Sequence, residues 1–192
     1  MNVERCVELL EKYIENPEEP ESNYNLGIFY EDAGHTASAV SYYLRTAERT
    51  NDVLLQYECL LRSSICFNKQ GCRNFTVKGM LQHAVALLPT RPEAYFLLSR
   101  FYERQNVDGS WTDSYVIASI GDRVAKFGQK PLRTWVEYPG DYGILFQKAV
   151  SSWWCGLCDE SRNLFNYLKD KYAMSKEYED AVNANLEKLY KK

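Results

Sequence analysis

The stretch that decides the fold is NYNLGIFYEDAGHTASAVSYYLRTA, residues 23–47. Apolar and aromatic residues recur in it at intervals of three and four, which is the spacing of one face of an α-helix. A small residue stands within each half, Gly27 in the first and Ala39 in the second. Small residues let two backbones approach closely, and a glycine after an amphipathic stretch is a common helix end. The pattern predicts two packed helices joined by a tight turn at Gly34.

This arrangement recurs along the chain. About ten helical stretches are indicated, and no stretch alternates strictly over the length of a strand. After the first copy at 20–51, weaker copies cover 53–89, 92–127 and 142–172, again with small residues where two helices would meet. The second turn is about one residue longer than the first, and the third turn, which begins at Asn106, is longer still. We predict one all-α domain over residues 1–192, with about four helix pairs.

Two further helices flank the pairs. The first covers residues 4–16 and has Val7, Leu10 and Ile14 on one face, so it is expected to be an orphan second helix. The last covers 175–190 and is expected to bury Tyr178, Val182, Leu186 and Leu189 as a cap, because an uncapped terminal repeat exposes its apolar face. The largest irregular segment, residues 128–141, contains Pro131 and Pro139. It separates the last two pairs.

The spacing of the first copy resembles the tetratricopeptide signature. That signature has Leu-Gly, a Tyr three residues later, a small turn residue, an Ala and then an aromatic residue. The matching positions are Leu26, Gly27, Tyr30, Gly34, Ala39 and Tyr43, with Asn23 in place of the usual leading aromatic. The resemblance extends in weaker form over nearly the whole chain. It implies a right-handed α-solenoid of tetratricopeptide-like pairs.

In tetratricopeptide proteins the first helices of successive pairs line a concave groove, where a partner binds. The resemblance places there Tyr24, Ile28, Leu61, Asn68, Lys69, Phe96, Arg100, Arg104, Phe146 and Trp153. Aromatic rings mixed with Lys and Arg suit a protein or peptide partner with acidic groups. The alternative is that Phe96, Phe146 and one Trp belong to the core. Chaperone-binding relatives clamp a carboxylate with Lys and Asn where this chain has Tyr24 and Ile28, so that role is not expected.

The charge is unevenly distributed. The chain has a net charge of −3, which argues against a general nucleic-acid binder. Residues 1–34 hold nine acidic side chains against two basic ones, whereas residues 62–104 hold seven basic side chains against two acidic ones. An anionic partner would favour the middle of the chain. With no secretory pattern at the start and no apolar run long enough to span a bilayer, we expect a cytoplasmic protein without a membrane partner.

A narrower resemblance concerns three strings: RPEAYFLL at 91–98, GSWTDSY at 109–115, and the run from DY at 141–142 to AVSSWWCG at 149–156. They resemble repeat regions that accompany family 2 glycosyltransferase domains in bacterial and phage proteins. Such transferases are expected to carry an Asp-x-Asp for a divalent metal, and no two aspartates here have that spacing. The resemblance implies an accessory, non-catalytic module. A glycosyltransferase domain would then be its partner.

Cys155 and Cys158 have the spacing of a thioredoxin redox motif. That motif should follow a strand, whereas Cys155 ends a helical pattern and Gly156 stands where a repeat turns. Ordinary buried thiols are therefore favoured over a redox enzyme.

Other catalytic or metal-binding groups are scarce. Cys59, Cys66 and Cys72 are the other close cysteines, and their spacing is unlike that of a zinc ribbon or finger. The chain has two histidines, His35 and His83, so few residues are available to act as the base of a nucleophile–base pair. We predict a scaffold without catalytic residues, metal or cofactor.

Overall fold

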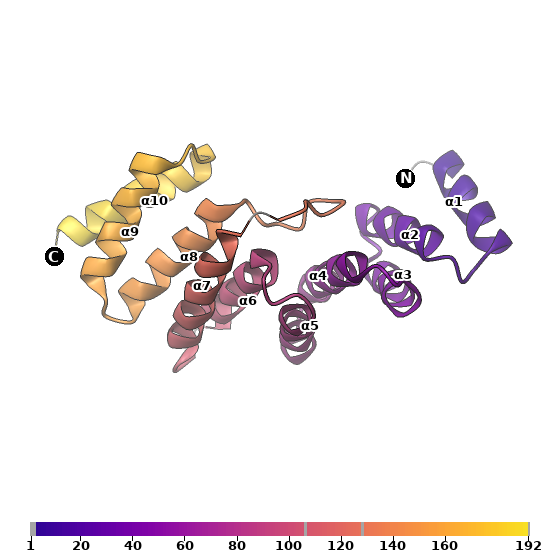
Figure 1. The fold of residues 1–192 in the computed structure, drawn as a ribbon, viewed down its shortest axis with the longest axis horizontal. Helices are drawn as coiled ribbons and strands as arrows, with labels where there is room; N and C mark the ends of the chain where they lie inside the picture. Colours follow the sequence, from indigo (N-terminus) through magenta and orange to yellow (C-terminus); the bar gives the residue numbers. More distant parts are fainter. Residues whose placement is uncertain (1–2, 106, 128, 192) are drawn as a thin grey trace. The chain divides into compact units, whose positions relative to one another are not determined.

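A computed structural model describes residues 3–105, 107–127 and 129–191. Within these residues the chain forms ten α-helices and no strand (Figure 1). The helices are α1 (Val3–Glu15), α2 (Pro20–Asp32), α3 (Thr36–Arg49), α4 (Val53–Gln70), α5 (Asn74–Leu87), α6 (Pro92–Gln105), α7 (Ser110–Ala125), α8 (Asp141–Trp154), α9 (Cys158–Lys171) and α10 (Lys176–Tyr190). The all-α prediction is confirmed. Asn106 and Gly128, where two breaks were predicted to begin, lie outside the described residues.

The helices begin and end where local chemistry favours it. Pro20 is the first residue of α2, where its missing N–H costs nothing, and the Glu19 carboxylate accepts a hydrogen bond from the Ser22 N–H. Asp52 caps α4 by accepting from the N–H groups of Leu54 and Leu55. Gly34 adopts φ +79° between α2 and α3, a conformation that side chains with a Cβ rarely adopt. The first predicted turn is confirmed at this residue.

The small residues lie where paired helices meet. A Cβ added to Gly27 of α2 would lie 2.5 Å from the Tyr43 ring of α3. In the third pair the Ser99 hydroxyl donates to the Ser114 carbonyl and the Ser114 hydroxyl to the Ser99 carbonyl, each at 3.1 Å. In the fourth pair the Ser161 hydroxyl donates to the Ala149 carbonyl at 2.7 Å. Serine thus replaces glycine or alanine, and its hydroxyl bonds the facing backbone.

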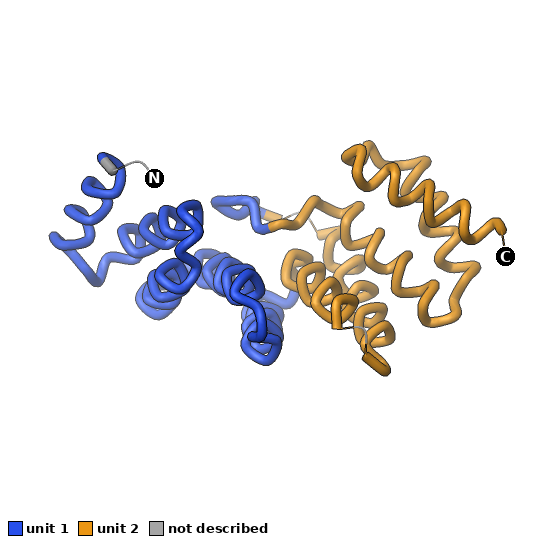
Figure 2. The backbone as a smooth tube through the Cα atoms, turned by 180° about the vertical axis from the view of Figure 1, so that it is seen from behind, with its two compact units in different colours: residues 1–89, 130–136 blue, residues 90–129, 137–192 orange. Residues whose placement is uncertain are grey.

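The contacts divide the chain into two compact units, coloured separately in Figure 2. Unit 1 comprises Met1–Pro89 and Lys130–Val136, and unit 2 comprises Thr90–Gln129 and Glu137–Lys192. In unit 1, α2 packs on α3, α3 on α4 and α4 on α5. In unit 2, α6, α7, α8, α9 and α10 pack in turn. The single domain over residues 1–192 stays a prediction, and each unit is described by itself.

The ends of the chain confirm one prediction and correct another. Val182, Leu186 and Leu189 of α10 are buried against α8 and α9, as expected for a cap, while Tyr178 is only partly buried. The predicted face of α1 is wrong for two of its three residues, because Val7 is 48% exposed and Ile14 is 72% exposed, whereas Leu10 packs as expected. Cys6, Leu9 and Tyr13 pack on α2 and α3 beside Leu10.

The predicted lengthening of the second turn is also wrong. Three residues separate α4 from α5, as three separate α2 from α3. The extra length of the second pair lies in α4 itself, which has 18 residues where α2 has 13.

Replacing Gly27 with Ala should destabilise the protein by about 1–3 kcal/mol, because the added methyl group overlaps the buried Tyr43 ring. Thermal unfolding followed by circular dichroism measures the effect. Gly79→Ala is the matched control, since Gly79 is also helical but has no atom within 4 Å of an added Cβ. The control should be neutral or stabilising by up to about 1 kcal/mol. Equal melting temperatures for the two variants would contradict the close approach.

Candidate functional site

The first helices of the two pairs in unit 1, α2 and α4, form one continuous surface. We define the unit 1 face as Tyr24, Ile28 and Glu31 of α2 with Glu58 and Arg62 of α4. Residues Lys130–Val136, from the irregular stretch between α7 and α8, pack on this face and belong to unit 1 (Figure 2). We call them the docked segment. The chain leaves unit 2 at Gln129 and returns to it at Glu137.

Glu58 holds the docked segment. Its side chain is fully buried, and a buried carboxylate is costly unless donors surround it. The backbone N–H of Arg133 donates to one carboxylate oxygen at 2.8 Å, and the backbone N–H of Thr134 donates to the other at 2.9 Å. The hydroxyls of Thr134 and Tyr24 also donate to it. Three of these donors point at one carboxylate oxygen and one at the other, so both oxygens of the buried charge are hydrogen-bonded.

Arg62 connects this carboxylate to a second one. Its guanidinium donates to the Thr134 hydroxyl oxygen at 2.8 Å and to Glu31 at 2.6 Å. Glu31 also accepts from the Tyr43 hydroxyl at 2.8 Å and from Lys69 at 3.3 Å. Burial alone would raise the pKa of Glu31, but the charge of Arg62 and these hydrogen bonds hold that pKa below its usual value. Arg62, the one basic residue of the unit 1 face, is therefore already paired.

The rim of the unit 1 face is acidic and receives Arg133. The Arg133 guanidinium donates to Glu21 at 2.6 Å and lies 3.5 Å from a carboxylate oxygen of Asp52. It also lies over the Tyr24 ring, 5.7 Å from the centroid. A cation held between two carboxylates and above an aromatic ring is a recurrent mode of arginine recognition.

The equivalent surface of unit 2 combines α6, α8 and α10. We define the unit 2 face as Arg100 and Arg104 of α6, Phe146 and Trp153 of α8, and Tyr178 of α10. The Arg100 guanidinium lies 5.5 Å from the centroid of the Phe96 ring, and Phe146 packs edge-on against Tyr178 at 5.1 Å. Burial raises the pKa of Tyr178, and the charge of Arg100 opposes that rise, so the two groups are close.

Arg100 and Arg104 lie one turn apart on α6 and repel each other. Burial, and then the charge of Arg100, lower the pKa of Arg104, while the carboxylates of Glu137 and Glu103 compensate only in part. Among the residues that the structure describes, neither guanidinium forms an ion pair with a carboxylate. Burial raises the pKa of the neighbouring Glu103, and the charges of Arg100 and Arg104 oppose that rise. An added anion would relieve this repulsion.

The ten predicted groove residues are placed as follows. Tyr24 and Ile28 lie on the unit 1 face, and Arg100, Arg104, Phe146 and Trp153 lie on the unit 2 face. Asn68 and Lys69 are exposed near the end of α4. Leu61 and Phe96 are 0% exposed, so neither presents its side chain to a partner, and we correct the prediction for these two. Tyr24 is buried as well, because the docked segment covers it.

Sequence reasoning missed Glu58, the docked segment and Tyr178 as members of these faces. Glu58 did give a signal. It is the one charged residue in the largely apolar run LLQYECLL, residues 54–61, and such a residue is almost never fully buried unless paired. The docked segment gave no periodic signal, because a bend has no repeat to detect.

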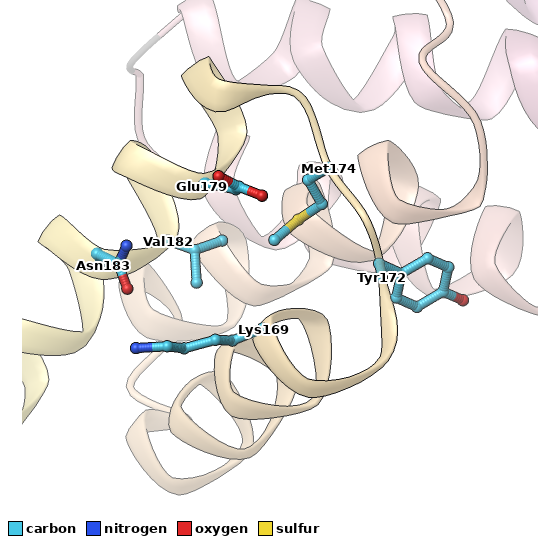
Figure 3. A pocket seen from close by; sticks show the side chains of 6 residues that line it. All are labelled: Lys169, Tyr172, Met174, Glu179, Val182 and Asn183. Carbon is cyan, nitrogen blue, oxygen red and sulfur yellow. The ribbon is translucent and has the colours of Figure 1, made fainter.

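A small hollow lies at the junction of α9 and α10 (Figure 3). Its volume is about 220 Å³, below the roughly 300–1,000 Å³ of sites that enclose small molecules. It is lined by Lys169, Tyr172, Met174, Glu179, Val182 and Asn183. The lining mixes one cation, one anion and apolar groups, without a cluster of converging polar atoms. We do not assign it a ligand.

The six cysteines are all free thiols. Cys155 follows the end of α8 and Gly156 turns the chain with φ +81°, as predicted, and Cys158 is the first residue of α9. Burial raises the pKa of Cys59 to about 12 and that of Cys66 to about 12, whereas Cys72 is exposed. Within residues 3–105, 107–127 and 129–191, no three His, Cys, Asp or Glu side chains group as metal ligands.

Comparison with known proteins identifies the fold. No protein-family model matches the chain, and no curated protein matches its sequence. The crystal structure of MamA, a tetratricopeptide-like protein, does match, with a TM-score of 0.64, 17% sequence identity, and coverage of 90% of this chain and 86% of that chain.

The chain has a tetratricopeptide-like, all-α solenoid fold. MamA lends no support to the resemblance with glycosyltransferase-associated repeats, which stays a prediction. None of the ten helices, within the described part of the chain, is both long and apolar enough to cross a bilayer.

Replacing Glu31 with Gln should lower the free energy of unfolding at neutral pH by about 1–3 kcal/mol, because Arg62 loses its carboxylate partner. The folded pKa of Glu31 is depressed, so its stabilisation is present above the unfolded pKa and is lost as the pH falls through the folded value. The gap between wild type and variant should therefore narrow between about pH 5 and pH 3. Urea unfolding at several pH values measures it.

Glu8→Gln is the control, because Glu8 also pairs with a lysine but is exposed on α1. It should change stability much less. A Glu31→Gln effect of the same size at pH 7 and pH 3 would show that charge is not its cause.

Iodoacetamide at pH 8 should label Cys72 much faster than Cys59 or Cys66 in the folded protein. Only the thiolate reacts, and burial keeps the latter two protonated as well as shielded. Mass spectrometry of tryptic peptides over time gives the three rates. In denaturant the rates should become similar. Equal rates in the folded protein would contradict the placement of Cys59 and Cys66.

Proposed function

We propose that this protein is a non-catalytic scaffold that binds an acidic segment of a partner protein on the unit 2 face. The observation that carries the proposal is the pair Arg100 and Arg104, two like charges on one helix turn without a carboxylate ion pair among the described residues. Tyr178 is close to Arg100, and Phe146 packs against Tyr178. Arg and aromatic residues supply much of the binding energy at interfaces between proteins.

The fold supports the same proposal. A tetratricopeptide-like solenoid presents the first helices of successive pairs as one continuous surface, which suits a protein segment better than an enclosed small molecule. The unit 1 face already holds a piece of irregular chain through side-chain-to-backbone hydrogen bonds. Placement in the cytoplasm and association with a glycosyltransferase remain predictions from the sequence.

The partner should be an acidic segment and not a basic one. Desolvation makes a pair of close guanidinium groups unfavourable, and a carboxylate placed between them would restore favourable charge and accept bidentate hydrogen bonds. Binding should weaken as salt rises, because these charges are partly solvent-accessible.

Changing both Arg100 and Arg104 to Glu should weaken partner binding at least about tenfold, because the reversed charges repel an acidic segment. The measurement is affinity capture from a lysate of the source cells, with the bound proteins quantified by mass spectrometry for wild type and variant.

The matched control reverses two exposed charges in the same unit, Arg123→Glu with Lys126→Glu at the end of α7. It should retain the captured proteins, and circular dichroism should show both variants folded. Capture of the same proteins in the same amounts by the Arg100 and Arg104 variant would refute binding at this face.

A further inference from the structure

We propose that the unit 1 face is a second binding site, for a bent protein segment with a basic residue followed by Thr or Ser, and that Lys130–Val136 is its displaceable internal occupant. This site lies in the other unit from the proposed acidic-segment site and selects the opposite charge. The two proposals are therefore independent, and an experiment that refutes one does not refute the other.

Glu58 sets the first requirement on any occupant. Three of the four donors to its carboxylate come from the docked segment: two successive backbone N–H groups and the Thr134 hydroxyl. Only the Tyr24 hydroxyl comes from the face itself. Two successive N–H groups that point at one anion form a nest, which requires a bend and excludes a regular strand. An occupant must therefore supply a bend with a hydroxyl side chain at its second residue.

The rim sets the second requirement. The position before the hydroxyl residue faces Glu21 and Asp52 and lies over the Tyr24 ring. A guanidinium satisfies all three at once, whereas an acidic side chain would be repelled by both carboxylates. The side chains of the unit 1 face therefore favour an occupant in which a basic residue is followed by Thr or Ser. Arg62 also contacts the docked segment: it donates to the Thr134 hydroxyl oxygen at 2.8 Å and to the Trp135 carbonyl at 3.4 Å.

The contacts that hold the docked segment are few enough for another peptide to displace it. The ion pairs of Arg133 are about half exposed, and such pairs contribute little to stability. The Trp135 side chain is 71% exposed, and Val136 is the one buried residue of the segment. The attachment therefore depends on the Glu58 bonds and on the burial of Val136. A free peptide can make those bonds too, but it competes with a tethered segment whose effective concentration is of millimolar order.

The test uses a fluorescent synthetic peptide with the sequence of residues 129–137 and the full chain. The loosened variant, Arg133→Ala with Thr134→Pro, removes the cation, the hydroxyl and one of the two backbone donors from the docked segment. Fluorescence anisotropy should show the peptide binding to this variant at least about tenfold more tightly than to wild type, because the tethered competitor is weakened. Trp135→Ala, which changes an exposed side chain of the same segment, should bind like wild type.

Two changes check the location of the bound peptide. Adding Glu58→Gln to the loosened variant should reduce binding at least about tenfold, because an amide cannot accept all the hydrogen bonds of a carboxylate. A peptide with Ala for its Arg and Val for its Thr should be weakened similarly. Binding that survives both changes would place the peptide elsewhere and overturn the proposal.

Hydrogen exchange of the wild-type chain gives a measurement that depends on no variant folding. Unlabelled peptide at about 5 mM, above the millimolar effective concentration of a tethered segment, should speed exchange of the Arg133 and Thr134 amides severalfold. A peptide of the same composition in scrambled order should not. Unchanged exchange with the matching peptide, together with no binding by a folded loosened variant, would show that the segment is a fixed part of unit 1 and defeat the proposal.

Discussion

The close approach of paired helices at small residues is the constraint on which the rest of the structure depends. Gly27 lets the Tyr43 ring lie against the backbone of α2, and this position directs the Tyr43 hydroxyl to Glu31. Glu31 in turn pairs with Arg62, which reaches the docked segment. The polar network of the unit 1 face is therefore aligned by a packing contact. Where serine replaces glycine, as in the third pair, hydroxyl bonds to the facing carbonyls maintain the same approach.

The net charge of a sequence segment does not give the net charge of the surface that the segment forms after folding. The basic middle of the chain suggested a site for an anionic partner, yet Arg62 and Lys69 of unit 1 share the carboxylate of Glu31, and Arg91 of unit 2 pairs with Glu93. These pairings neutralise part of the positive excess in each unit, whereas Arg100 and Arg104 form no carboxylate ion pair among the described residues. A count treats every ionised group as free, whereas a folded surface presents only the groups that its neighbours leave unmatched.

The helices and their small contact positions were predictable because both depend on local spacing. A period of three to four residues survives in a single sequence, even where the repeats are degraded. The contact between Glu58 and Thr134 joins residues 76 positions apart and follows no period, so no local pattern could reveal it. The buried face of α1 was missed for a related reason: Val7 and Ile14 are apolar, but only the partner helix decides which apolar residues are covered.

Burying a carboxylate is a poor way to hold a loop if stability is the only need. An apolar side chain of similar size at residue 58 would avoid the desolvation of the charge, and the docked segment already buries one apolar side chain, Val136. Glu58 adds hydrogen bonds, which depend on the orientation of the donor groups. Apolar packing tolerates small shifts, whereas two successive N–H groups aimed at two carboxylate oxygens fix the bend and its register to a single residue. A face that accepts one register is able to distinguish between segments, which is the property that the proposed binding site requires.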